Sequence, residues 1–457
     1  MSSRPFPALL LATSLLATTV LGATMLVAAN SPAAARPFTA ADLIGLDRLS
    51  DPQVSPDGSR VVYALRSTDL SANKGVSALW VLSLKDPHAA PVAVPGGAGA
   101  HDPRWTADGQ AVLALKPSAP GSQPATTQVW RLALDSPGAA QVTHLPLDVT
   151  SFRPAADDQH LVVSMDVFPD SESADDTRAR QDRAGAAKAE GRVYDQLFVR
   201  HWDSWADGTR SHLFAVSMTG NTAPVALMPH VDGDTPSKPF GDEADYAISA
   251  DSRSVFFSVR TAGRTEPWST NFDIWQVPLD GSGAPRNLTA ANPAWDARPT
   301  PSPDNRFLAW AAMKRPGFEA DRFGVVVLDL STGQSREIAP HWDRSAQDLA
   351  WSPDGKTLYV TADEFGQAKL FAMDVSSGRT VALTDQGHVS APAPIPGGGI
   401  LVQRDALDSP AQLWRIPGNG GAGAQLTHVD ADKLAGIELV PGEQFSFAGW
   451  NNETVHG

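Results

Sequence analysis

Four segments of the sequence combine aromatic side chains with carboxylates at close spacing. They are RHWDSWADGTR (200–210), GRTEPWSTNF (263–272), KRPGFEADR (314–322) and DEFGQ (363–367). Rings and carboxylates together suit a cationic, partly apolar ligand such as the free amino end of a peptide. The residues that we expect to contact it are Trp202, Asp203, Trp205, Trp268, Glu319 and Asp321. The alternative is structural, because such carboxylates often bond the backbone of their own loop or pair with a nearby arginine.

Sequence motifs for other chemistries are missing. The chain holds no G-x-S-x-G nucleophile elbow, no H-E-x-x-H zinc motif and no glycine loop for phosphate or dinucleotide binding. Its histidines, His201 among them, lack the spacing of metal ligands. We therefore assign no catalytic, cofactor-binding or metal-binding residue and expect no cofactor. The net charge of −15, with 36 basic and 51 acidic residues, disfavours nucleic acid as a partner.

A repeated turn organises the chain that must position these segments. A Ser/Thr-Pro/Ala-Asp-Gly turn follows a short strand-like stretch and precedes an apolar run, as in QVSPDGSRVVYAL (53–65). Pro presets φ, Asp bonds its own backbone and Gly accepts positive φ, so this sequence favours a hairpin turn. The copies centre on Asp57, Asp108, Asp157, Asp251, Asp304, Asp354 and, with the aspartate lost, Pro396.

The repeat predicts a β-propeller. A third apolar strand follows each turn, as in ALWVLSL (78–84), and a short fourth strand fits, as in RNLT (286–289). Four strands in each repeat of 40–53 residues is typical of a propeller blade. We therefore predict an all-β fold, a seven-bladed β-propeller over residues 36–430. A β-sandwich or two unrelated all-β domains would not explain the regular interval.

One interval is longer, which indicates an insertion. Asp157 and Asp251 are 94 residues apart, so blade three should carry extra residues at about 166–211. We expect a flexible, charged first part followed by a short helix, and then the aromatic loop. Connections between second and third strands emerge on one face of a propeller, because alternate connections in an up-and-down sheet alternate ends. The insertion should therefore share a face with the other three aromatic and acidic segments.

The N-terminus reads as an export signal. Arg4 precedes an uncharged stretch over 8–29, and Ala33-Ala34-Ala35 offers a cleavage site for a signal peptide spanning 1–35. An uncleaved membrane anchor is the alternative, because 22 uncharged residues could just span a bilayer. Cysteine is absent, so neither disulfides nor a lipid-attachment cysteine are expected. We predict a periplasmic or secreted protein of bacterial type with no stable membrane span after cleavage.

Several motifs resemble a known family. VYDQLFVRHWDSWADGTRSHLF (193–214), AMKRPGFEADR (312–322) and WSPDGKTLYVTADE (351–364) are similar to the N-terminal half of prolyl-oligopeptidase-family serine peptidases. Within that family the acylaminoacyl-peptidase and dipeptidyl-peptidase five branch is the most similar. The resemblance implies that an α/β-hydrolase with a Ser-Asp-His triad follows the propeller. Residues 431–457 then look like a linker and the first hydrolase strand, and no triad residue can be assigned in this chain.

The resemblance also implies a role. In the family the propeller covers the active site, admits short peptides and binds their amino end, so peptides with a free or blocked amino end and a hydrolase domain are the expected partners. We expect Asp203, Glu319 and Trp202 to lead this binding and the chain alone to be inactive. The alternative is a non-catalytic periplasmic binding or scaffolding propeller, similar to those of the Tol system. Finally, a ring of this kind can close its seventh blade with a strand from each chain end, and we expect residues 431–457 to lie unpaired without a hydrolase to pack on.

Overall fold

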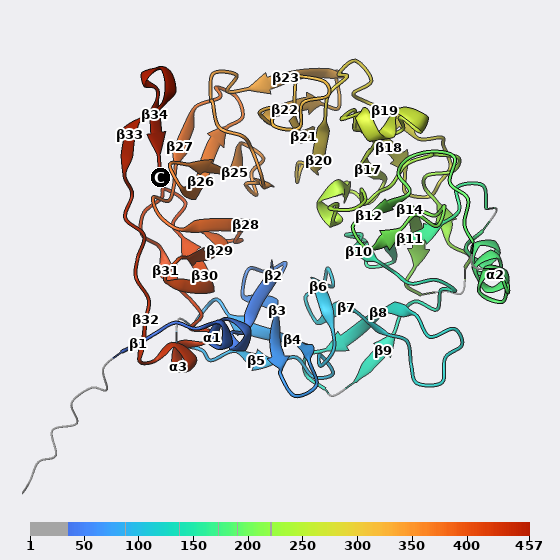
Figure 1. Cartoon of the computed structure of the whole chain (residues 1–457), viewed down its shortest axis with the longest axis horizontal. Coiled ribbons are helices and arrows are strands. Elements are labelled where there is room, and N and C mark those ends of the chain that lie inside the picture. The colour runs from blue at the N-terminus through green and yellow to red at the C-terminus, as the bar shows by residue number, and fades with distance from the viewer. Residues whose placement is uncertain (1–34, 87, 137, 172, 190, 220–221) are drawn as a thin grey trace, which may run out of the picture.

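The computed structural model describes residues 35–457 except 87, 137, 172, 190, 220 and 221, so the signal-peptide prediction falls almost wholly outside the described residues. The described chain is mostly β-structure, as the sequence predicts, and its sheets stand around one axis (Figure 1). None of its described helices is long and apolar enough to cross a membrane.

Five of the sheets contain four strands each, joined in chain order and antiparallel. The first two sheets consist of β2 (Arg48–Val54), β3 (Arg60–Asp69), β4 (Lys74–Ser83) and β5 (Val92–Ala93), and of β6 (His101–Trp105), β7 (Ala111–Pro117), β8 (Thr127–Ala133) and β9 (Ala139–Gln141). The third consists of β10 (Ser151–Pro154), β11 (His160–Val167), β14 (Arg210–Ser217) and β15 (Val225–Ala226). The fourth and fifth consist of β16 (Tyr246–Ile248), β17 (Ser254–Val259), β18 (Asp273–Pro278) and β19 (Arg286–Asn287), and of β20 (Asp296–Pro301), β21 (Phe307–Ala312), β22 (Gly324–Asp329) and β23 (Gln334–Ile338).

The remaining large sheet has eight strands and divides into two similar halves. One half is β24 (Leu349–Trp351), β25 (Thr357–Glu364), β26 (Gln367–Asp374) and β27 (Thr380–Ala382). The other is β28 (His388–Pro394), β29 (Ile400–Ala406), β30 (Ser409–Ile416) and β31 (Ala424–Gln425). The halves meet at one parallel pair, Ala368 with His388, and all other pairs in the sheet are antiparallel. Each half is therefore a four-stranded unit like the other sheets.

Smaller elements complete the described chain. The helices are α1 (Ala40–Gly45), α2 (Ala174–Gly185) and α3 (Ala431–Leu434), with 3₁₀ turns η1 (Glu243–Asp245), η2 (Gly263–Trp268) and η3 (Trp450–Asn452). Three short strand pairs lie outside the large sheets: β1 (Arg36–Pro37) with β32 (Ile437–Glu438), β12 (Arg200–His201) with β13 (Ser204–Trp205), and β33 (Ser446–Ala448) with β34 (Thr454–His456).

The core lies between neighbouring units. Alternate residues of β3 face opposite neighbours: Val62 packs with the β6–β9 sheet, whereas Val61 and Tyr63 pack with the β28–β31 unit. A strand buried on both sides reads as a continuous apolar run, which explains sequences such as VVYAL (61–65). Similar buried clusters join each unit to the next around the ring.

The ring closes through side-chain packing between its first and last units. Leu49 and Leu82 of the β2–β5 unit pack against Ile395 and Leu413 of the β28–β31 unit. Each of these units is formed by consecutive strands, so neither of them combines strands from the two chain ends. The ends instead meet beside the ring, where β1 pairs with β32.

The C-terminal residues are also more ordered than expected. Lys433 forms ion pairs with Asp47 and Asp430, both at 2.8 Å, and Gln444 donates a hydrogen bond to the Phe365 carbonyl. With the β1–β32 pair and the β33–β34 hairpin, these contacts correct the prediction that residues 431–457 lie unpaired.

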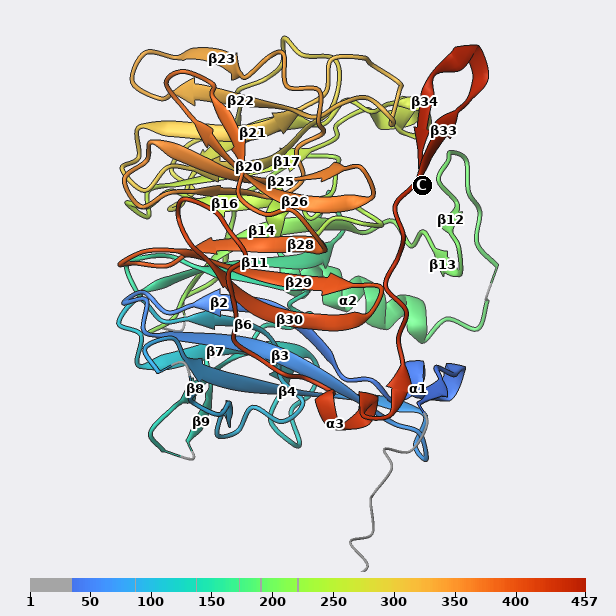
Figure 2. The same ribbon diagram turned by 90° about the vertical axis from the view of Figure 1, so that its left-hand side faces the viewer.

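The two faces of the ring carry different connections. We call the face with the first-to-second strand turns the turn face; its turns lie at 55–59, 106–110, 155–159, 249–253, 302–306, 352–356 and 395–399. We call the opposite face the loop face. It carries the second-to-third strand connections and those between units, and Figure 2 shows α1, β12, β13, β33 and β34 along it.

Candidate functional site

The aromatic and acidic segments all lie in connections of the loop face. The longest runs from β11 to β14 and contains α2, β12 and β13. Here α2 comes first, begins at the Ser173 N-cap, and precedes an irregular stretch, so the expected order of flexible part and helix is reversed. Exposed aromatic side chains mark this connection and its neighbours: Trp202, Trp205, Trp268, Phe318 and Phe365.

Trp202 and Asp203 form the tip of the β12–β13 hairpin. Arg200 pairs with Trp205 and His201 with Ser204, which leaves Trp202 and Asp203 as the two central turn residues. Trp202 has a φ of 47°, a left-handed conformation that is uncommon for a bulky side chain. The Arg200 guanidinium donates a hydrogen bond to the Trp202 carbonyl and helps to hold this turn. Both tip side chains are exposed.

Trp202 belongs to a cluster of three rings. Its ring centroid lies 4.9 Å from that of His201 and 5.4 Å from that of Phe240, and His201 and Phe240 are 5.6 Å apart. Phe240 lies between β15 and η1, so two distant segments build the cluster. The sequence analysis missed Phe240. The signal that could have found it is the one that marks the other segments: an aromatic residue within a polar stretch that contains Gly and Pro, here SKPFGDE (237–243).

Trp205 is used within the hairpin itself. Its ring stacks on Tyr194 at 6.1 Å, and the Arg200 guanidinium lies 5.8 Å from its centroid. The Tyr194 hydroxyl donates to the Ala206 carbonyl at 3.0 Å. Trp205 therefore has cationic and aromatic neighbours from its own segment, whereas Trp202 points its ring to Phe240.

Trp268 lines a shallow pocket among three connections, β17–β18, β19–β20 and β21–β22. The pocket has a volume of about 200 Å³ and is lined by Thr265, Trp268, Ser269, Thr270, Pro293, Pro316 and Gly317. The Gly317 amide donates to the Thr270 hydroxyl at 2.8 Å, which ties the 314–322 segment to the η2 connection. The structure thus brings Trp268 beside the segment that contains Glu319 and Asp321.

Glu319 and Asp321 differ although they are neighbours. Asp321 accepts the backbone N–H groups of Lys314 and Arg315 at 2.8 and 2.7 Å, which closes the loop. Burial alone would raise the pKa of Asp321, but these backbone hydrogen bonds outweigh it and lower the pKa. Glu319 is exposed at the loop tip. Asp321 is thus engaged in shaping the loop on which Glu319 stands.

Other carboxylates of the loop face are neutralised by basic side chains. Glu266 pairs with Arg210 at 2.8 Å and with Arg260 at 3.4 Å. Glu364 pairs with Arg344 at 2.7 Å and with Lys369 at 2.8 Å. No hydrogen bond or ion pair joins the carboxylate of Asp203 or Glu319 to another side chain in the described part of the molecule.

Arginines also cover two of the exposed rings. Arg315 lies 4.2 Å from the Phe318 centroid and Arg344 lies 5.4 Å from that of Phe365. Phe365 further contacts His456 of β34 at 4.6 Å. These two rings are therefore occupied by neighbours, and Trp202, Phe240 and Trp268 are the more accessible aromatic surfaces.

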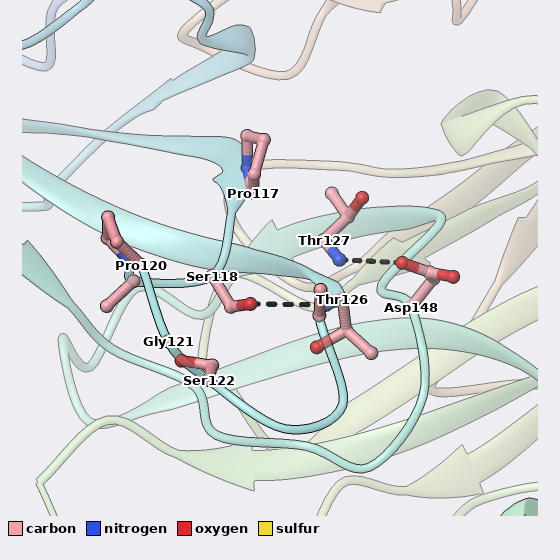
Figure 3. A pocket seen from close by; sticks show the side chains of 10 residues that line it. Pro117, Ser118, Pro120, Gly121, Ser122, Thr126, Thr127 and Asp148 are labelled. Carbon is pink, nitrogen blue, oxygen red and sulfur yellow. Dashed lines mark hydrogen bonds between the residues drawn. The ribbon is translucent and has the colours of Figure 1, made fainter.

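A second pocket lies at the connection between β7 and β8 (Figure 3). It measures about 270 Å³, and Pro117, Pro120, Ser122, Thr126 and Asp148 are among its lining residues. Its polar groups hold the loop together: Thr126 N–H donates to the Ser118 hydroxyl, and Thr127 N–H donates to Asp148 at 2.6 Å. The sequence analysis did not point to this pocket. Across the described residues, no three His, Asp or Glu side chains gather as metal ligands would.

Comparisons with known proteins identify relatives of the chain. Dipeptidyl-peptidase 5 of Porphyromonas gingivalis is 26% identical over 383 residues, which cover 83% of this chain and 54% of the relative. The chain therefore spans about half the length of the curated relatives that it matches. No protein-family model matches it.

Solved structures share the fold. Acylaminoacyl peptidase of Pyrococcus horikoshii aligns with a TM-score of 0.66 and 15% identity over 91% of this chain and 57% of its own. The β-propeller domain of the trilobed protease from Pyrococcus furiosus aligns with a TM-score of 0.56 and 13% identity, over 84% of this chain and 97% of that domain. The resemblance read from the sequence is confirmed: the chain is a β-propeller homologous to part of the dipeptidyl-peptidase 5 proteins, with the fold of the corresponding part of acylaminoacyl peptidase.

Proposed function

We propose that this chain is the peptide-binding, substrate-gating propeller of an exported serine exopeptidase of the prolyl oligopeptidase family. In this proposal the loop face binds the amino end of a short peptide, and an α/β-hydrolase supplies the Ser-Asp-His triad. The names of the relatives and the position of the aromatic and acidic segments support it.

The observation that carries the proposal is the contrast among loop-face carboxylates. Glu266 and Glu364 are each paired with two basic side chains, and Asp321 accepts hydrogen bonds from backbone amides of its own loop. Asp203 and Glu319 stand exposed beside Trp202 and near Trp268. A ligand ammonium leaves water at a cost unless it meets a carboxylate, and a ring face adds cation–π attraction. These two positions therefore offer what an amino terminus requires.

The number of blades belongs to the same proposal. We count β24–β27 and β28–β31 as separate blades, because they share a single residue pair and have an apolar cluster between them. With the five four-stranded sheets this makes a seven-bladed propeller. Blade three then carries the insertion whose hairpin presents Trp202 and Asp203.

Peptide binding by the full chain tests the site. We expect a dipeptide amide with a free amino end to bind, and its N-acetyl form to bind at least about tenfold more weakly, because a charge-assisted hydrogen bond is lost. Asp203→Asn and Glu319→Gln should weaken the free peptide and leave the acetylated one unchanged. Asp408→Asn removes an equivalent exposed charge from the β29–β30 connection and serves as the control. Equal binding of both peptides by all four proteins would overturn the proposed site.

Hydrolysis distinguishes the peptidase from a non-catalytic binding module. A full-length protein that includes a hydrolase should cleave a dipeptidyl chromogenic substrate, and a serine-directed inhibitor should stop it. Peptide binding without such cleavage would instead favour the module. Export is tested separately, since the mass of the mature chain should begin at about residue 36 if the signal is cleaved.

A further inference from the structure

The three-ring cluster of His201, Trp202 and Phe240 has the features of a binding platform. Trp202 and Phe240 are 70% and 72% exposed, although they are large apolar side chains in contact with each other. Contiguous exposed apolar groups are uncommon on a stable monomer and usually mark an interaction site. The ring contacts themselves leave the outer faces of Trp202 and Phe240 open to solvent.

Both segments of the platform are fixed by contacts away from the rings. In the Phe240 segment, Gly241 N–H donates to the Ser237 carbonyl at 2.6 Å, and Ser237 N–H donates to Asp245 at 2.8 Å. A Cβ on Gly241 would lie only 2.2 Å from the Ser237 nitrogen, so this turn requires glycine.

The hairpin is anchored as well. Ala206 N–H donates to the Val199 carbonyl at 3.0 Å, and Arg264 of η2 donates to the Asp195 carbonyl at 2.7 Å. A platform held in this way loses little conformational entropy when a ligand binds.

The charge beside the platform defines what would bind. Asp203 follows Trp202 directly and lies at the same hairpin tip. In a peptide, the α-ammonium and the first side chain are attached to the same carbon, so a group that binds the ammonium also places that side chain nearby. A large apolar side chain buries more area against two rings than a small one does.

We propose that the His201–Trp202–Phe240 platform selects peptides whose amino-terminal residue has a large apolar side chain, while Asp203 binds the ammonium of that residue. This inference rests on the proposed function and adds the selectivity and the residues Phe240 and His201. Trp205, Phe318 and Phe365 are less suited to the role, because arginines already lie against their rings.

The test compares three peptides on the full chain by calorimetry: Phe-Ala amide, Gly-Ala amide and N-acetyl-Phe-Ala amide. We expect Phe240→Ala to weaken Phe-Ala amide about tenfold and to change Gly-Ala amide less than twofold. Leu407→Ala, which truncates an 84% exposed side chain on the β29–β30 connection, should change neither. Trp202→Leu should also reduce the preference for Phe-Ala amide over Gly-Ala amide. Because Trp202 is exposed, this second variant should still fold.

The outcomes separate this inference from the proposed function. If Phe240→Ala and Trp202→Leu bind Phe-Ala and Gly-Ala amides with the wild-type ratio, the platform does not select the side chain, although amino-end binding stands. If the wild-type chain binds none of the three peptides, both the selectivity and the proposed function are overturned.

Discussion

The two faces of the ring differ in the balance of local and long-range interactions. The turn face has bonds between neighbouring units, such as Asp251 N–H to Asn305 at 3.1 Å, but each of its turns is closed mainly by local bonds. On the turn face, each hydroxyl bonds an aspartate two residues later: Ser55 to Asp57, Ser249 to Asp251 and Ser352 to Asp354, each at 2.6 Å. The loop face also has local bonds, such as Lys314 N–H to Asp321, but several of its bonded residues are far apart in sequence. The Asp47 amide donates to Asp430 at 2.8 Å, 383 residues away, and Arg210 pairs with Glu266 across 56 residues.

Near the axis of the ring, ion pairs also join residues that are far apart in sequence. Arg104 of β6 pairs with Asp51 of β2 and with Glu243 of η1, both at 2.6 Å, and Arg153 of β10 donates to the Glu243 carbonyl. This network joins residues from three units and from the η1 connection near the inner edge of the ring (Figure 1). Hydrogen bonds within one repeat therefore shape the turns of each blade. The placement of blades and loops relative to one another depends on ion pairs and hydrogen bonds between residues of different repeats.

The largest effect should come from breaking a long-range pair. Arg104→Ala would leave Asp51 and Glu243 near each other without their cation, which typically costs about 3–5 kcal/mol for a buried pair. Urea unfolding monitored by tryptophan fluorescence measures this loss. Arg253→Ala on the turn face is the control, because Arg253 is 85% exposed and 4.0 Å from Asp251. Equal losses in the two variants would contradict the contrast between faces.

A buried carboxyl should make stability depend on pH. Burial raises the pKa of Asp296 to about 7, more than its bonds from Asn292 and Trp310 lower it, and the nearby Asp273 carboxylate adds to the rise. The folded state therefore holds a proton that the unfolded chain releases near pH 4, so stability falls as the pH rises from about 5 to 7.5. The expected loss is on the order of 3 kcal/mol.

Asp296→Asn checks the source of that dependence. The asparagine keeps the shape of the side chain and does not titrate, so unfolding curves between pH 5 and 8 should be flatter than those of the wild type. Burial also raises the pKa of Asp273, so Asp273 would account for any pH dependence of stability that remains. A slope as steep as in the wild type would show that another group is responsible.

The smallest effect should come from one turn. Asp304→Ala removes the acceptor for the Ser302 hydroxyl and for the Arg306 amide, at 2.5 and 3.1 Å, and should cost about 1 kcal/mol. The Ser302 hydrogen bond is the main cause that lowers the pKa of Asp304, so the turn's contribution should fade as the pH drops below about 4. Asp304→Asn keeps an acceptor and should recover part of the loss. A cost as large as that of Arg104→Ala would be inconsistent with a purely local role.

The sequence predicted what local chemistry determines. The Asp-Gly turns and the apolar runs after them gave the hairpins, because both signals lie within about 15 residues, as in QVSPDGSRVVYAL. The position of Trp202 beside Phe240 could not be read in the same way, since the two residues are 38 positions apart and β14 and β15 lie between them. Likewise, nothing near Glu266 in sequence indicated that Arg210 would neutralise it.

Other errors had a similar origin. The order of helix and irregular stretch in the insertion was misjudged because α2 has little apolar periodicity, and its Ser173 cap was the better signal. The mode of ring closure could not be read from the sequence, because local patterns cannot tell whether the last strand of a ring comes from the same end of the chain as its neighbours. The packing of Leu49 against Ile395 joins the first and last units, and this contact is visible only in the folded structure.

The seam between the β2–β5 and β28–β31 units contains an apolar cluster, as the other seams of the ring do, although the seam between β24–β27 and β28–β31 adds one residue pair. Each unit is folded from consecutive residues, and the chain ends already meet at the β1–β32 pair. The arrangement of units in the ring therefore does not depend on which unit is translated first. A circularly permuted gene, opened at another connection between units and with the present chain ends joined, encodes the same contacts between the units. The present starting point is one of several from which this ring could be synthesised.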